Sequence, residues 1–138
     1  MDFRTTSVAD LAQSVRTNKM SARELTQEAL DRITALNPTY NAFVAVDAEQ
    51  AMADAAAIDE VTAKGGDPGL LAGIPLAVKD NHDAVGYRTT FGAPVLADAP
   101  AATADSPFVA RLKAAGCVVV GKTNLPEFAW SGNTTNAL

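Results

Sequence analysis

Apolar residues in the first half of the chain recur at helical spacing, each time behind a polar residue that can begin a helix. Ser7 stands three residues before Asp10. Ser21 stands three residues before Glu24, which is the spacing of a capping box. One apolar face follows, made of Ala22, Leu25, Ala29, Ile33 and Leu36. The pattern predicts two helices, the second ending at Asn37-Pro38 because the residue before a proline disfavours helical torsion angles.

A third helix is predicted over the alanine-rich stretch "AEQAMADAAAIDEVTAK". Asp47 and Gln50 have the spacing of an N-terminal cap, and Gly65-Gly66 provides the end. Residues 1–66 therefore form a predicted helical layer.

The second half of the chain has the order of strands and helix that is typical of a parallel sheet. Apolar and other residues alternate over 74–79, which predicts a buried strand. Ser106-Pro107 then begins a short helix that Gly116 ends, and "CVVVG" predicts a second buried strand. Strand, crossover helix and strand indicate an α/β fold, with residues 73–138 as the start of its core.

Lys79 is the first candidate for chemistry, because it ends the first predicted strand. Functional sites gather at the C-terminal ends of parallel strands, and Lys122 lies just past the end of the second one. A buried ammonium is costly unless it is paired, so a lysine that points into the core needs a reason. We expect Lys79 to be buried.

The sequence "GCVVVGKT" at 116–123 fits the written pattern of a phosphate-binding P-loop. Its four middle positions are Cys117 and three valines, which are stiff and strand-forming and resist the turns that such a loop needs. We therefore predict a strand here and reject a nucleotide site.

Composition narrows the function further. The formal net charge is −5, which argues against binding nucleic acid. No apolar run is long enough to span a bilayer, and the first residues lack a signal-peptide core. Cys117 is the only cysteine, so it cannot form an intrachain disulfide, and we expect a cytoplasmic location. His82 with its flanking Asp80 and Asp83 is a poor metal set, so we expect an exposed loop histidine and no metal.

Four blocks in order carry a resemblance to a known family. They are "GIPLAVKDN" (73–81), "TTFGA" (89–93), "DSPFVARLKAAGCVVVGKTNLPEFA" (105–129) and "SGNTTN" (131–136). Together they resemble the amidase signature family. The resemblance implies a mixed, partly parallel sheet covered by helices, with residues 1–138 as the N-terminal portion of one such domain.

The resemblance also implies a chemistry. Members of the family hydrolyse or transfer carboxamides through a serine acyl-enzyme, using a serine, cis-serine, lysine triad and no cofactor. The family lysine falls on Lys79, with Asp80 and Asn81 in support. Substrate contacts fall on the segment of Trp130, Ser131 and Gly132, whereas Thr89, Thr90 and Gly92 are expected to be turn and packing residues.

The glycine- and serine-rich segment of the family, with both catalytic serines, is absent from these residues. We therefore expect the 138-residue chain alone to be inactive and the C-terminal remainder of the fold to be its partner, with unpaired strand edges in its absence. The expected substrate is a small amide, and a homodimer stays open. Two alternatives remain, the glutaminase-type component of a tRNA-dependent amidotransferase and a non-catalytic fragment.

Overall fold

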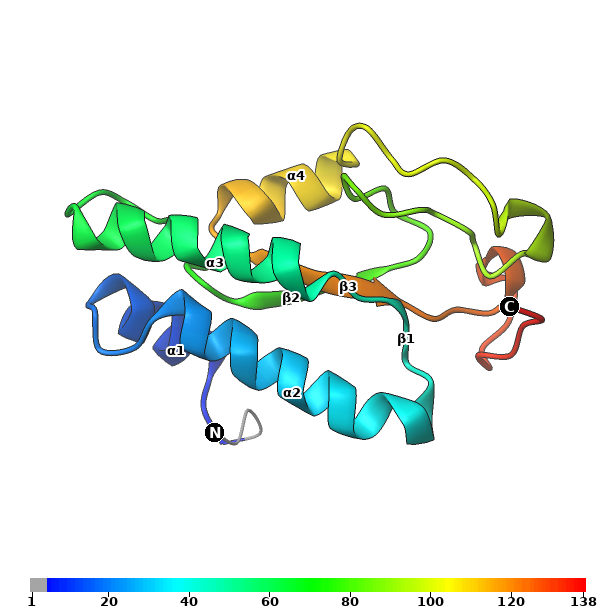
Figure 1. Ribbon diagram of the computed structural model, residues 1–138, viewed down its shortest axis with the longest axis horizontal. Coiled ribbons are helices and arrows are strands. Elements are labelled where there is room, and N and C mark those ends of the chain that lie inside the picture. The colour runs from blue at the N-terminus through cyan, green and yellow to red at the C-terminus, as the bar shows by residue number, and fades with distance from the viewer. Residues whose placement is uncertain (1–4) are drawn as a thin grey trace.

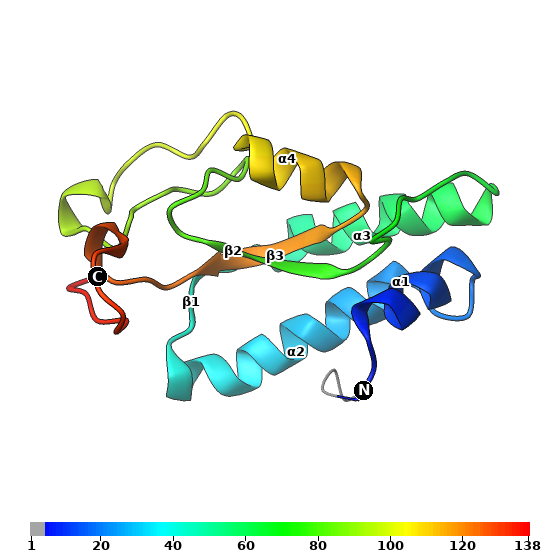
Figure 2. The ribbon, with the colours of Figure 1, turned by 180° about the vertical axis from the view of Figure 1, so that it is seen from behind.

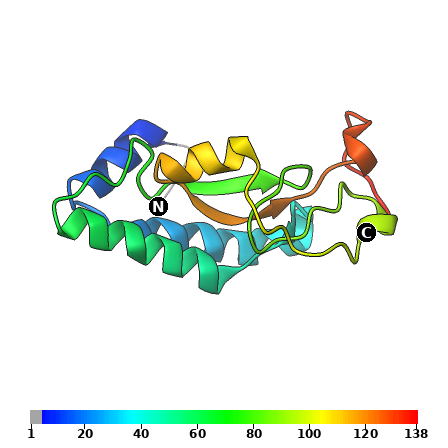
Figure 3. The ribbon, with the colours of Figure 1, turned by 90° about the horizontal axis from the view of Figure 1, so that it is seen from above.

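Three helices lie on one side of a small sheet in the computed structural model, which describes residues 5–138 (Figure 1). They are α1 (Val8–Arg16), α2 (Ala22–Tyr40) and α3 (Ala48–Ala63). The strands are β1 (Phe43–Ala45), β2 (Pro75–Lys79) and β3 (Val118–Thr123). Helix α4 (Pro107–Ala114) lies on the opposite face from α2 and α3, as Figures 2 and 3 show. Two single-turn 3₁₀ helices, η1 (Pro94–Leu96) and η2 (Glu127–Ala129), complete the chain.

The predicted helix starts are confirmed by their caps. Ser21 Oγ accepts from the amide of Glu24 at 3.0 Å, and the Glu24 carboxylate accepts from the amide of Ser21 at 2.8 Å. The side chains of Ser7 and Asp47 cap α1 and α3 in the same way. Each such cap satisfies an amide that has no partner inside its helix.

The predicted end of α2 is wrong by three residues. The helix continues through Pro38 to Tyr40 and ends at Asn41, which is left-handed with φ of 47°. The side chain of Asn37 also bridges to Phe43, accepting from its amide at 2.8 Å and donating to its carbonyl at 3.0 Å. A proline in the last turn is tolerated here because these contacts fix the exit of the chain.

The sheet has the order β1-β3-β2, with β3 in the centre. Strand β2 pairs with β3 in parallel, and β1 pairs with β3 antiparallel. The predicted α/β fold with a mixed, partly parallel sheet is confirmed. The sequence did not predict β1, which lies inside the residues expected to be helical. Both β1 and β2 are edge strands in this chain, as expected if the sheet continues elsewhere.

The valines of β3 divide the interior into two cores. Val118 and Val120 pack with the buried residues of α1, α2 and α3. Val119 packs on the other face with Val78 of β2 and Val109 of α4. A central strand buried on both faces explains why its sequence is a continuous apolar run. Within residues 5–138, none of the helices has both the length and the apolar character needed to cross a membrane.

Candidate active site at the ends of the parallel strands

Lys79 ends β2, as predicted, but its side chain is exposed. Val78 and Asp80 are buried, whereas Ala77 and Lys79 are exposed, so neighbouring residues point to opposite faces. The expectation that Lys79 is buried within this chain is therefore wrong. Its neighbour Asp80 takes the inward position, and β2 is an edge strand with nothing beyond it. Among residues 5–138, no hydrogen-bond or ion-pair partner contacts the Lys79 amine.

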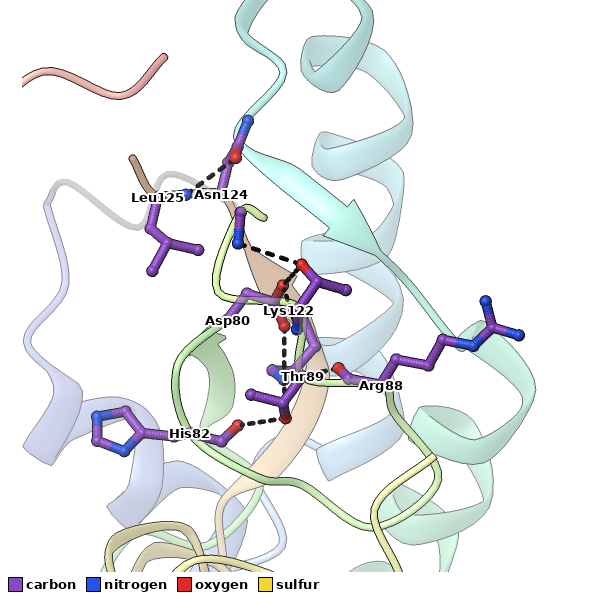
Figure 4. A network of polar contacts seen from close by, with 9 residues as sticks. Asp80, His82, Arg88, Thr89, Lys122, Asn124 and Leu125 are labelled. Carbon is purple, nitrogen blue, oxygen red and sulfur yellow. Dashed lines mark hydrogen bonds and ion pairs between the residues drawn. The ribbon is translucent and has the colours of Figure 1, made fainter. Parts of the chain in front are cut away.

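The buried lysine of this region is Lys122, which is 0% exposed inside β3. Its ammonium donates to the carbonyl of Arg88 at 2.9 Å and to Oγ1 of Thr89 at 3.0 Å. The third neighbour is Oδ1 of Asp80, 2.8 Å from Nζ. Figure 4 shows these groups gathered around Lys122. Two hydrogen bonds and one ion pair compensate for most of the hydration that burial removes.

Asp80 is 1% exposed and is the anionic half of this pair. Its Oδ2 accepts from the amide of Thr90 at 3.1 Å and from Oγ1 of the same residue. Its Oδ1 contacts Lys122 as an ion pair without the alignment of a hydrogen bond. Two charges at this depth are tolerated only because they face each other and share further polar contacts.

The sequence predicts Lys79 as the buried lysine, whereas the structure shows that it is Lys122. A lysine in a strand of consecutive valines is more often buried than a lysine at the end of an alternating strand, because the valine strand is covered on both faces. The sequence places Lys122 just past the end of the second predicted strand, but the structure has it inside β3. Thr89 and Thr90 are expected from the sequence to serve turns and packing. Instead both threonines bind the buried pair.

The rejection of the P-loop agrees with the structure, because residues 118–123 form a strand rather than a loop. A Cβ on Gly121 would lie 2.4 Å from the carbonyl oxygen of Ala45. The glycine of the motif therefore permits close packing of β1 on β3, which is an architectural role.

Asn81 follows the pair directly and is partly buried. Its Oδ1 is buried and has no hydrogen-bond partner within residues 5–138. A buried acceptor without a donor costs stability, which indicates that a donor is expected at this position.

The expected substrate segment lies at the surface. Trp130 is 91% exposed, and Gly132 has open space around it. Ser131 Oγ accepts from the amide of Asn133 at 3.2 Å. Trp130 thus neither packs on this chain nor closes a pocket within it. No hydrogen bond joins these three residues to Lys79 in the described part of the chain.

An apolar hollow lies on the face of β2 to which Lys79 points. Its volume is about 300 Å³, and Pro75 and Ala77 of β2 line it together with Leu11 and Ile33 of the helical layer. Because Ala77 and Lys79 are two positions apart on one strand, they share this face. The hollow therefore lies on the face of β2 that carries Lys79, and it reaches that strand at Ala77.

Two further residues were assessed from the sequence. His82 is half-buried, not exposed as expected, and its ring packs 5.2 Å from the ring of Phe108. In Figure 4 its ring points away from the buried pair. No group of metal-ligating side chains occurs among the described residues. Cys117 is 7% exposed, as predicted, and burial raises the pKa of its thiol.

Comparison with known proteins then decides the family. The model of the Amidase family matches residues 24–138. The chain belongs to the amidase family. It is 44% identical over 131 residues to the A subunit of the glutamyl-tRNA(Gln) amidotransferase from Cyanothece sp., covering 95% of this chain and 27% of that protein. It is 42% identical over 132 residues to the indoleacetamide hydrolase of Bradyrhizobium diazoefficiens, covering 96% of this chain and 25% of that protein.

Solved amidases have the same arrangement of elements. The native peptide amidase of Stenotrophomonas maltophilia superposes with a TM-score of 0.85 at 35% identity, covering 96% of this chain and 28% of that chain. This chain spans about a quarter of the length of the relatives it matches, and the resemblance to amidase signature enzymes is confirmed.

Proposed function

We propose that Lys79 is the catalytic base of an amide-cleaving enzyme in which this chain supplies one part of the fold. The observation that supports this best is the position of Lys79, which ends a parallel strand, is exposed and has no polar partner for its amine within residues 5–138. Ala77, two positions earlier on the same strand, lines an apolar hollow. An amine in that position is free to accept a proton once the rest of the site covers it.

The proposed chemistry is a serine acyl-enzyme. A serine hydroxyl is a weak nucleophile until a base removes its proton, and a neutral amine can do so. Free lysine has a pKa near ~10.4 and is charged at neutral pH. Apolar groups that cover an amine disfavour its charged form. In the serine, cis-serine, lysine triad the remainder of the fold supplies both serines, so the 138-residue chain alone is proposed to be inactive.

The substrate is proposed to be a small carboxamide. Trp130, Ser131 and Gly132 are exposed and free to line its acyl pocket, and Asp80 and Asn81 are proposed to support the base. The orphaned Oδ1 of Asn81 favours a donor from the remainder of the fold or from the substrate.

A second candidate function is the glutaminase reaction of a tRNA-dependent amidotransferase, with this chain as part of the glutaminase-type component. It is favoured by the 44% identity to the amidotransferase relative, which is similar to the 42% identity to the indoleacetamide hydrolase. The two candidates share the base and differ in the amide donor. The third candidate is a non-catalytic fragment, for which we expect no turnover of glutamine or of another amide. The cytoplasmic location and the homodimer remain predictions.

The experiment measures ammonia release from glutamine and from indoleacetamide. This chain is supplied together with the remainder of the amidase fold, as wild type, Lys79→Ala and a control, Lys64→Ala. The control removes an exposed lysine that pairs only with Glu60. We expect turnover in wild type and control and a loss of at least ~10²-fold in Lys79→Ala, the lower range for a positioned base. Full turnover by Lys79→Ala would refute the proposal.

A further inference from the structure

The backbone amide, the backbone carbonyl and both carboxylate oxygens of Asp80 each contact a polar group of the chain. Its amide donates to the carbonyl of Thr123 in β3 at 3.0 Å. Its own carbonyl accepts from the amide of Phe91 at 3.0 Å. Its two carboxylate oxygens contact Lys122 and Thr90. The residue after β2 is therefore tied both to the central strand and to the loop over residues 88–91.

This attachment decides where Lys79 points. Adjacent side chains in an extended segment lie on opposite faces, so drawing Asp80 inward turns Lys79 outward. The Lys79 carbonyl also accepts from the amide of His82 at 3.0 Å, which fixes the backbone beyond Asp80. A long, flexible lysine side chain reaches a defined point only if its Cα is fixed, and small misplacements cost rate.

The same pair holds a loop that contacts η2, just before the proposed substrate segment. The carbonyl of Phe91 accepts from the amide of Phe128 at 2.8 Å, and the two rings lie 6.1 Å apart. Gly92 packs so closely that a Cβ there would lie 2.7 Å from the carbonyl of Leu125. Trp130 follows two residues after Phe128, so the loop connects the buried pair to the segment that precedes Trp130.

We propose that the ion pair between Asp80 and Lys122 positions Lys79 for proton transfer. Lys122 is fully buried and reaches no substrate, so it is a positioning residue that acts through Asp80. The inference rests on the proposed function of Lys79 as base. It extends that function by assigning a role to a buried lysine in the neighbouring strand.

The first test needs no substrate and measures amide hydrogen exchange in the chain with Lys122→Met. We expect the exchange rates of the amides of Asp80, Thr90 and Phe91 to rise by about tenfold or more. Local opening of this segment no longer has to break the ion pair, so it costs less free energy. The amide of Val118, which donates to Ile74 at 2.9 Å on the far end of β3, should be accelerated less than these three amides, by the loss of global stability alone. Unchanged exchange at the three amides, or equal acceleration at Val118, would overturn the positioning role.

The matched control is Lys113→Met. It removes a lysine whose ion pair with Asp105 is also short, at 2.9 Å, but lies near the surface. Exchange at Asp80, Thr90 and Phe91 should not change in this variant. A change as large as that of Lys122→Met would show that any lost lysine loosens the loop, and would overturn the proposal.

The second test is kinetic, in the amidase assembled as above. We expect Lys122→Met to lower kcat by about tenfold or more with little change in KM, because the base is misplaced while binding persists. The double variant Asp80→Asn with Lys122→Met removes both charges and so avoids an orphaned buried ion. It should still show the low kcat. A double variant with the kcat of wild type would assign the pair to stability alone and overturn the proposal.

The outcomes separate this inference from the proposed function. Loss of turnover in Lys79→Ala with wild-type kcat in the Lys122 variants leaves Lys79 as base and overturns its positioning by the pair. Full turnover in Lys79→Ala overturns both.

Discussion

Removing the positive charge of Lys122 should be among the most destabilising single changes in the chain. Lys122→Met keeps the length of the side chain but leaves the carboxylate of Asp80 buried at 1% exposure without its cation. Breaking a buried pair in this way typically costs about 3–5 kcal/mol. A chain of 138 residues has a total stability of roughly 7–20 kcal/mol at typical values per residue. The expected fall in melting temperature is about 10–20 °C.

A double-mutant cycle isolates the pair. Asp80→Asn with Lys122→Met removes both charges, so its loss of stability should be smaller than the sum of the single losses by about 1–3 kcal/mol. Lys113→Met, which breaks the more exposed pair with Asp105, should cost at most about 1 kcal/mol. The assay is urea unfolding followed by circular dichroism. Fluorescence is a poor choice because Trp130, the sole tryptophan, is already exposed.

Two results would refute this reasoning. The first is a Lys122→Met chain as stable as the Lys113→Met control, which would show that the orphaned carboxylate carries no penalty. The second is strictly additive losses in the double variant, which would show that Asp80 and Lys122 do not interact energetically.

Three further predictions concern other parts of the chain. Gly121→Ala should lower the free energy of unfolding by about 1–3 kcal/mol, because the added Cβ forces β1 away from β3. Gly132→Ala should leave it unchanged, because no atom lies near that position. Urea unfolding of both variants checks this, and equal losses of stability would contradict it. Burial raises the pKa of Asp105, but hydrogen bonds from the amide of Val85 and from Lys113 outweigh it, so the pKa lies below its usual value. Its stabilisation is therefore present above the unfolded pKa near ~3.9 and is lost as pH falls through the folded pKa. Asp105→Asn should be more destabilising at pH 7 than in acid, and a penalty independent of pH contradicts this. The Cys117 thiol should react at least ~10²-fold more slowly with a thiol reagent in the folded chain than in urea, because burial limits access and raises its pKa; equal rates would contradict its burial.

Local signals allowed the helices to be predicted, because their beginnings depend on neighbours in sequence. Ser21 and Glu24 satisfy each other's backbone amides within one turn, so the spacing alone predicts the capping box. The end of α2 was missed because it depends on Asn37 binding the backbone of Phe43, a contact that no proline rule includes.

Strand β1 was missed for a related reason. It has three residues, and its pairing partner β3 lies some eighty positions further along the chain. A segment that short is extended because β3 offers it a partner, and its own sequence carries little information about that partner.

The candidate site was half predictable. The alternation over 74–79 predicted the strand that Lys79 ends, but it did not predict that Asp80 turns inward and Lys79 outward. Which of the two side chains is buried depends on β2 being an edge strand and on Lys122 lying in β3, and both are properties of the assembled sheet. The rule that a buried charge needs a partner applied after all, to Lys122 instead of Lys79.

The most direct test of Lys79 as the base is a single-turnover measurement of acyl-enzyme formation in the assembled amidase. Wild type and Lys64→Ala should show a rapid phase, and Lys79→Ala should form acyl-enzyme at least ~10²-fold more slowly at neutral pH, because its serine then lacks a base. A rapid phase of unchanged rate in Lys79→Ala would contradict the assignment.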